Sequence, residues 1–261
     1  MKPGIYFDIP NEDYHADEGI SKSKLDMVDK SSALIPWYKE APIDKEKLSA
    51  LDMGSAIHCA VLEPDEFSKR FIKSPKFNLR TNKGKLDQEA FLVDCEDSGK
   101  TVLDYEQHRK INLMAGSIYA HPAARALLDM PGYSEPSIYW IDDETENLLK
   151  IRPDRLVKDR PIILDLKKTA DMDRLLRWHI EEFRYHVQDA MYSDGAQHHF
   201  GEPYSFVFIA VSETIDCGRY PVRVFTLEPS KKKRGHDLYR INLLTYSECK
   251  RTGHWGGIEI I

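Results

Sequence analysis

The chain has 261 residues, of which 41% are hydrophobic and 31% charged, enough apolar material for the core of one large domain or two small ones. No apolar run approaches the roughly 18–20 residues that cross a bilayer, which excludes a helical membrane-spanning protein. The net charge of −6 disfavours a protein that coats nucleic acid nonspecifically, so any cationic contact with DNA or RNA has to be local.

The N-terminal residues and the cysteines indicate a compartment. Asp8, Glu12 and Asp13 stand where a secretory signal would need an apolar core. The four cysteines are far apart and form no C-x-x-C pair, which argues against a zinc ribbon or a disulfide framework. We therefore expect a reduced, cytoplasmic setting and no membrane partner.

Residues 1–130 are predicted to form the mainly helical part of a single domain. Helices are expected within 21–40, from about 47 to 62, and in two pieces over 104–130 divided at Pro122. Residues 70–85 are rich in Lys, Arg, Asn and Ser, and they predict a long basic loop.

Residues 131–261 are expected to supply the sheet core and a C-terminal helix. Short β-prone runs cover 137–141, 148–156, 161–166, 204–212 and 220–227. Helices are expected over about 172–195 and 229–251. An antiparallel meander is the simplest arrangement of the first three runs. The pattern predicts an α/β (α+β) fold with a helical N-terminal part.

Asp165-Leu166-Lys167 closes the third β-prone run. Side chains alternate along a strand, so Asp165 and Lys167 should project from the same side. An ionised aspartate within an Ile-Ile-Leu strand is costly to desolvate, and a hard divalent cation would compensate. Asp154 lies eleven residues earlier, and a hairpin would bring it beside Asp165. Taken alone, an Asp-x-Lys pair is more often a solvent-facing salt bridge.

Two predicted helices carry further polar pairs at a spacing of four residues. Gly54 and His58 lie one helical turn apart, and so do Gln188 and Tyr192. A lone helical histidine is more often a surface or core residue, and a Gln/Tyr pair is more often a polar stripe. Each pair on its own therefore carries little functional weight.

In this order, the motifs resemble the RecB-like exonuclease branch of the PD-(D/E)xK nuclease superfamily. That branch shows a G-x-x-x-H helix, a Pro-Asp, a (D/E)-x-K and a Q-x-x-x-Y helix. Residues 21–25, 53–64 and 255–257 extend the resemblance to the C-terminal nuclease domains of the RecE type (exodeoxyribonuclease VIII), across nearly the whole chain. The resemblance implies the PD-(D/E)xK core, with a mixed central sheet flanked by helices.

The resemblance also implies a Mg²⁺ centre, for which Mn²⁺ is a possible substitute. Its ligands would be His58, Asp154, Asp165 and the backbone carbonyl of Leu166. Lys167 would position and help to deprotonate the attacking water, or steady charge on the phosphate. Gln188 and Tyr192 would contact the DNA backbone, or orient Lys167 and the metal shell. Glu135 is a further acidic candidate, and an exposed turn carboxylate is the alternative.

The implied activity is 5′→3′ digestion of linear double-stranded DNA without ATP, which leaves 3′ single-stranded tails for recombination and repair. The absence of a G-x-x-x-x-G-K-[ST] motif fits ATP independence. The implied partners are double-stranded DNA ends, further copies of the chain in a ring-like homotetramer, and a single-strand annealing protein of the RecT type. Whether one or two metal ions bind stays open.

Two basic segments are candidates for gripping DNA. The first contains Lys73, Lys76, Arg80, Lys83 and Lys85, with one aromatic residue and no acidic one between them. The second is the run 231–234 at the start of the last predicted helix, where positive charge is unfavourable to the helix dipole. An ordinary solvated surface is the alternative for both.

Three other functions stay open. A structure-selective DNA endonuclease could use the same site, and it would cut closed circular duplex. A non-catalytic DNA-binding or assembly module could use the same fold, although the acidic and lysine positions of the motifs are intact. A hydrolase of small phosphoesters would leave the basic segment 70–85 without a purpose.

Overall fold

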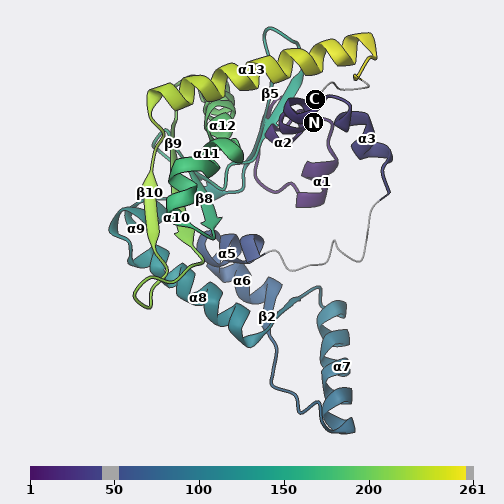
Figure 1. The fold of residues 1–261 in the computed structure, drawn as a ribbon, viewed down its shortest axis with the longest axis vertical. Coiled ribbons are helices and arrows are strands. Elements are labelled where there is room, and N and C mark those ends of the chain that lie inside the picture. Colours follow the sequence, from purple (N-terminus) through teal and green to yellow (C-terminus); the bar gives the residue numbers. More distant parts are fainter. Residues whose placement is uncertain (43–52, 257–261) are drawn as a thin grey trace.

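A computed structural model describes residues 1–42 and 53–256 and has a five-stranded sheet at its centre (Figure 1). In spatial order the strands are β10 (Val222–Phe225), β9 (Ser205–Ser212), β8 (Ile162–Thr169), β7 (Arg155–Val157) and β4 (Gly132–Ser134). β8 and β9 run parallel, and the other neighbours pair antiparallel. The sheet is therefore mixed, as expected.

A second, antiparallel sheet consists of β1 (Gly4–Tyr6), β5 (Ser137–Ile141) and β6 (Leu148–Ile151). The predicted meander is therefore wrong beyond its first hairpin, because the run 148–156 is two strands in two sheets. The chain leaves β6 at Arg152, and Pro153 follows. Proline has no backbone N–H and restricts the residue before it, so a ladder cannot continue through this point.

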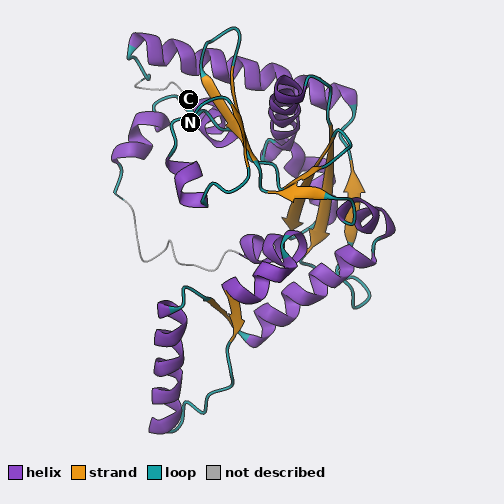
Figure 2. Cartoon of the chain, turned by 180° about the vertical axis from the view of Figure 1, so that it is seen from behind, coloured by secondary structure: helices purple, strands orange, loops and turns teal. Residues whose placement is uncertain are grey.

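Helices cover both faces of the central sheet (Figures 1 and 2). Leu164 and Leu166 of β8 belong to a core shared with α5 (Met53–Leu62) and α8 (Tyr105–Ala120). Ile163 belongs to a core on the other face, which includes residues of α12 (Tyr185–Phe200). Consecutive residues of β8 thus face different helical layers, as strand geometry requires.

The remaining helices are mostly short. They are α1 (Asn11–Ala16), α2 (Lys22–Lys30), α3 (Leu34–Glu40), α6 (Pro64–Arg70), α7 (Asn82–Asp97), α9 (Pro122–Leu128), α10 (Met172–Arg174), the π-helix η1 (Leu175–His179), α11 (Ile180–Glu182) and α13 (Pro229–Thr252). The predicted break at Pro122 is confirmed. Predicted helical residues 47–52, and Gly257 of the last motif, lie outside the described residues. Within 1–42 and 53–256, no helix combines the length and apolarity needed to cross a membrane.

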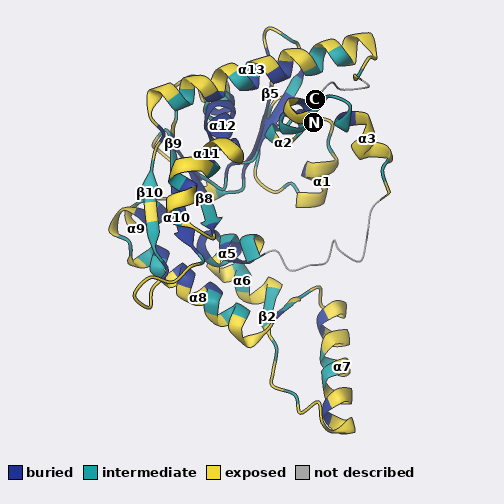
Figure 3. Cartoon of the chain, viewed as in Figure 1, coloured by how far each residue is buried: buried dark blue, intermediate teal, exposed yellow. Residues whose placement is uncertain are grey.

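Residues 71–103 form an arm that projects from the body and is largely exposed (Figures 1 and 3). Its base is a parallel pair, β2 (Phe71–Lys73) with β3 (Thr101–Leu103), and its tip carries α7. The predicted basic loop is shorter than 70–85, because Thr81 caps α7 by accepting a 3.0 Å hydrogen bond from the Gly84 backbone. The basic residues after Thr81 are therefore helical.

α13 packs along α12 at very close range. A Cβ placed on Gly235 would lie 2.0 Å from the backbone oxygen of His186. Only glycine permits this approach, and it brings α13 against the start of α12.

We predict that Gly235→Ala lowers the free energy of unfolding by about 1–3 kcal/mol, because one of the two backbones has to move. Gly116→Ala is the matched control, since Gly116 is also helical and a Cβ there meets no atom within 4 Å. The control should gain about 0.5–1 kcal/mol. Urea denaturation followed by circular dichroism measures both, and equal stability of the two variants would contradict this account of the packing.

The same helix pair buries a carboxylate that the sequence did not single out. Asp189 is 1% exposed, with Ser193 Oγ donating to its Oδ1 at 3.3 Å and Lys232 Nζ lying 3.4 Å from its Oδ2. Burial raises the pKa of Asp189 from 3.8 to about 6, although Lys232 opposes the rise. The folded protein therefore holds this proton to a higher pH than the unfolded chain does.

Asp189 should consequently destabilise the fold as pH rises from about 4 to about 6, since the unfolded state releases the proton first. We predict that Asp189→Asn has the same free energy of unfolding as the wild type near pH 4. At pH 7 the free energy of unfolding of the variant should be higher by up to about 3 kcal/mol. Denaturation curves at both pH values test this. If the stability difference between Asp189→Asn and the wild type were the same at pH 4 and pH 7, burial would not raise the pKa of Asp189 as described.

Candidate active site

Asp165 and Lys167 project together from the face of β8 that turns toward α12. Asp165 is 1% exposed, and its Oδ2 lies 2.6 Å from Lys167 Nζ. The alternation predicted for this strand thus places both charged groups in one spot. Two opposite charges this deep in the protein are tolerated because each compensates the other.

Gln188, in the first turn of α12, joins this pair. Its amide nitrogen donates to Asp165 Oδ1 at 2.6 Å, and its amide oxygen accepts from Lys167 Nζ at 2.9 Å. One side-chain amide therefore contacts both the acid and the amine, which fixes all three groups relative to one another.

Asp154 immediately precedes β7 and stands opposite Asp165. The strand register pairs Arg155 with Leu164, so the next pair along is Asp154 with Asp165. Asp154 Oδ2 accepts the Leu166 backbone N–H at 2.6 Å. Burial raises the pKa of Asp154 to about 6, an effect that His58 opposes and Asp165 reinforces. Two carboxylates side by side favour a cation between them.

His58 reaches this spot from α5, on the other face of the sheet. Its Nδ1 lies 3.7 Å from Asp154 Oδ2, and its Nε2 lies 2.8 Å from the Leu166 carbonyl oxygen. A carbonyl oxygen only accepts, so this contact requires the proton on Nε2. The structure thus links His58, Asp154 and the Leu166 backbone directly, and Asp165 lies next to Asp154 across the strand pair.

The donor set suits Mg²⁺ or Mn²⁺, since it consists of carboxylate and carbonyl oxygens with one imidazole. Asp165 Oδ2 is buried without a hydrogen bond of good geometry, despite its ion pair with Lys167, and so retains accepting capacity. In the described residues, however, no three His, Cys, Asp or Glu side chains are already gathered as a metal cage. The His58–Leu166 contact would have to open for Leu166 to become a ligand.

A pocket of about 270 Å³ opens beside these groups. Predicted residues Glu135, Asp154, Gln188 and Tyr192 line it. The Glu135 backbone donates to the Asp154 carbonyl oxygen at 3.0 Å from a left-handed conformation with φ of 49°. The rest of the lining consists of Arg152 and an N-terminal wall, which is made by Asn11, Tyr14, His15, Ser21, Lys22 and Ser23.

Several members of this site were missed by sequence reasoning. Of the N-terminal wall, only residues 21–25 belonged to a motif. The centre of the Tyr185 ring lies 4.6 Å from Lys167 Nζ. Its position three residues before Gln188, on the same helical face, is the signal that could have revealed it.

Lys167 is held in its charged form. Burial alone would lower the pKa of Lys167, but the carboxylates of Asp165 and Asp154 outweigh burial and raise it above its ordinary value. An ammonium group can donate hydrogen bonds and neutralise negative charge, but it cannot accept a proton.

The predicted basic contacts lie outside this pocket. Lys73, Lys76, Arg80, Lys83 and Lys85 are exposed on the arm, with the first two amines 5.6 and 5.4 Å from the Tyr105 ring centre. Within the run 231–234, Lys232, Lys233 and Arg234 pair with Asp189, Asp237 and Glu181 at 3.4, 2.7 and 2.7 Å. These ion pairs give the second run a structural explanation.

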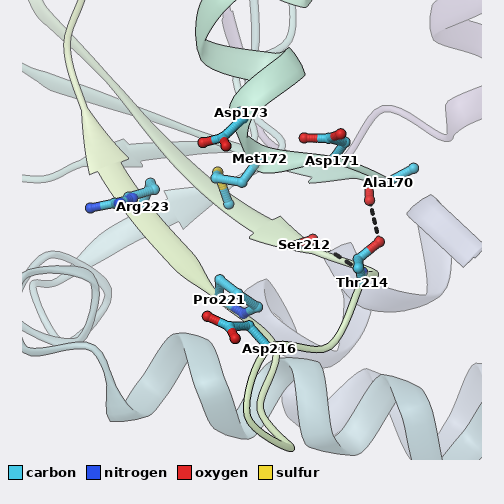
Figure 4. A pocket seen from close by; sticks show the side chains of 9 residues that line it. All are labelled: Ala170, Asp171, Met172, Asp173, Ser212, Thr214, Asp216, Pro221 and Arg223. Atoms are coloured by element: carbon cyan, nitrogen blue, oxygen red, sulfur yellow. Dashed lines mark hydrogen bonds between the residues drawn. The ribbon is translucent and has the colours of Figure 1, made fainter.

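Another cavity, of about 320 Å³, lies beyond the ends of β8 and β9 (Figure 4). Asp171, Asp173 and Asp216 line it together with Arg223, and Thr214 donates to the Ala170 carbonyl at its edge. None of the residues predicted to act in catalysis lines this cavity, so we assign the site to the pocket beside Asp154.

Comparisons with known proteins agree with this architecture. The chain is similar in structure to a candidate exonuclease from Eubacterium rectale, known from a crystal structure at 2.19 Å resolution. The two superpose with a TM-score of 0.61 and 13% sequence identity, over 98% of this chain and 97% of the other. This similarity shows a shared fold. A protein named SSO0001 reaches only a TM-score of 0.30 at 11% identity, over 74% of this chain and 87% of its own, and carries no argument. No curated protein matches significantly.

The sequence pattern of one family matches residues 21–258. This range includes His58, Asp154, Asp165, Lys167 and Gln188 of the site. That family is described as a PDDEXK-like domain of unknown function (DUF3799). The match covers far more than half of the 261 residues. This chain therefore belongs to the family of PDDEXK-like domains known as DUF3799.

Proposed function

We propose that the protein is a Mg²⁺-dependent nuclease that hydrolyses DNA phosphodiester bonds, and that it acts as an exonuclease on linear double-stranded DNA. The observation that carries the proposal is the mutual contact of Asp165, Lys167 and Gln188, with Asp154 beside them in the lining of an open pocket. Membership of a PDDEXK-like family supports it.

The residues divide the work of hydrolysis between them. Asp154 and Asp165, with His58 and the Leu166 carbonyl, would hold a Mg²⁺ ion that lowers the pKa of a water molecule and neutralises phosphate charge. Lys167 donates from its ammonium to the phosphate or to the attacking water. Gln188 keeps Lys167 aimed, since its amide oxygen accepts from Nζ at 2.9 Å. Burial strengthens each of these contacts by excluding water.

The finer features of the proposal rest on the order of the sequence motifs. They are ATP-independent 5′→3′ digestion, a ring-like tetramer, and delivery of 3′ tails to an annealing protein of the RecT type for recombination and repair. The exposed cations of the arm are proposed to follow the DNA backbone. The similar fold of the candidate exonuclease supports exonucleolytic action.

Lys167→Gln should lower the rate of cleavage of an end-labelled linear duplex by about 10²–10³-fold, because it removes charge stabilisation from the transition state. Lys168→Ala is the matched control, since Lys168 is the next residue of β8 and pairs with Glu213 instead. The control should cleave at the wild-type rate. EDTA should stop cleavage by the wild type and by Lys168→Ala. Wild-type activity in Lys167→Gln would refute the catalytic assignment of Lys167.

The form of the DNA separates exonuclease from endonuclease. We predict that linear duplex is degraded and that covalently closed circular duplex of the same sequence is left intact, because only the former offers ends. Gel electrophoresis with Mg²⁺ measures both. Linearisation of the closed circle would favour the structure-selective endonuclease, and binding of duplex without cleavage of either form would favour the non-catalytic module.

A further inference from the structure

The segment between β8 and α12 presents two aromatic side chains to solvent. Trp178 is 66% exposed and Phe183 is 47% exposed. Trp178 lies in the π-helix η1, a rare conformation that recurs at functional sites. Both rings therefore lie on the one segment that connects β8 to α12.

The turn that carries Phe183 is held in place from two directions. Arg184 adopts a left-handed conformation with φ of 55°, unfavourable for a non-glycine residue. Its buried guanidinium pairs with Asp26 at 2.7 Å and Asp29 at 2.5 Å, and donates to Asn242 at 2.5 Å. Strained backbone persists where the surroundings over-determine it, often at functional sites. Phe183 therefore sits on a rigid support built by α2 and α13.

Phe183 is connected to the active site by two sets of contacts. Its backbone oxygen accepts from Lys22 Nζ at 2.8 Å, and Lys22 lines the same pocket as Gln188. Its ring centre lies 5.9 Å from that of Tyr185, whose ring in turn lies 4.6 Å from Lys167 Nζ. A row of rings thus leads from the buried amine to the surface.

Charged side chains of both signs surround this row of rings. Arg174 and Arg177 are exposed on the same segment. Asp171 and Asp173 are exposed on this segment as well, while Glu181 pairs with Arg234 at 2.7 Å and Glu182 lies 3.9 Å from His179. The His179 ring lies 4.9 Å from the Phe183 ring, which widens the flat surface.

We propose that Phe183 stacks on an unpaired DNA base next to the phosphate that the pocket would bind. Trp178 would stack on a further base of the same strand. This rests on the proposed nuclease function. Aromatic faces with neighbouring cations bind single strands without sequence preference, because every base has a π-face. The platform would hold a strand that has separated from its complement at a duplex end.

The test measures the binding of a fluorescein-labelled oligo-dT of about 12 nucleotides by fluorescence anisotropy. EDTA is present so that no cleavage occurs. Phe183→Ala and Trp178→Ala should each weaken binding roughly tenfold, the loss expected for one stacked base. Phe183→Tyr should restore affinity, and Phe183→Leu should not, since leucine is apolar without a π-face.

Phe200→Ala and Trp37→Ala are matched controls, because Phe200 is 39% and Trp37 is 60% exposed on other helices. Both should bind like the wild type. Wild-type affinity in Phe183→Ala, full rescue by Phe183→Leu, equal losses in the controls, or no binding by the wild type would each overturn the platform. Aromatic-dependent binding without duplex cleavage would keep the platform and refute the nuclease; cleavage with unaffected binding would do the reverse.

Discussion

The ion pair between Asp165 and Lys167 is the interaction on which the rest of the site depends. Either charge alone at this depth would be strongly destabilising. The two charges compensate each other, and Gln188 contacts both partners. Gln188 can do so only if α12 is docked against β8, and the close approach at Gly235 fixes the start of α12 against α13. The chemistry of one buried pair therefore constrains the packing of three elements.

The second constraint is the interruption at Pro153. The chain leaves the sheet of β6 at this point and enters the central sheet at β7, which places Asp154 directly opposite Asp165. A continuous strand would have kept Asp154 in the ladder of a single meander. The same junction brings Arg152 and Glu135 to the pocket, where they meet the N-terminal wall. The site thus forms where the two sheets part.

What could be read from the sequence was local or periodic. Strand alternation predicted that Asp165 and Lys167 share a side, and helical spacing put Gln188 and Tyr192 on one face; both geometries are observed. The N-terminal wall, the Tyr185 contact and the burial of Asp189 depend on tertiary packing, which no local pattern encodes. The helix α7 was missed because its sixteen residues are largely exposed and lack a clear apolar stripe.

Metal binding tests the central claim most directly, because it does not depend on knowing the substrate. Isothermal titration calorimetry with Mn²⁺, a spectroscopically and thermodynamically convenient substitute for Mg²⁺, should give saturable binding to the wild type. Asp154→Asn should abolish that binding while circular dichroism shows the fold intact. Equal binding by both proteins, or no saturable binding by the wild type, would contradict a cation held between Asp154 and Asp165.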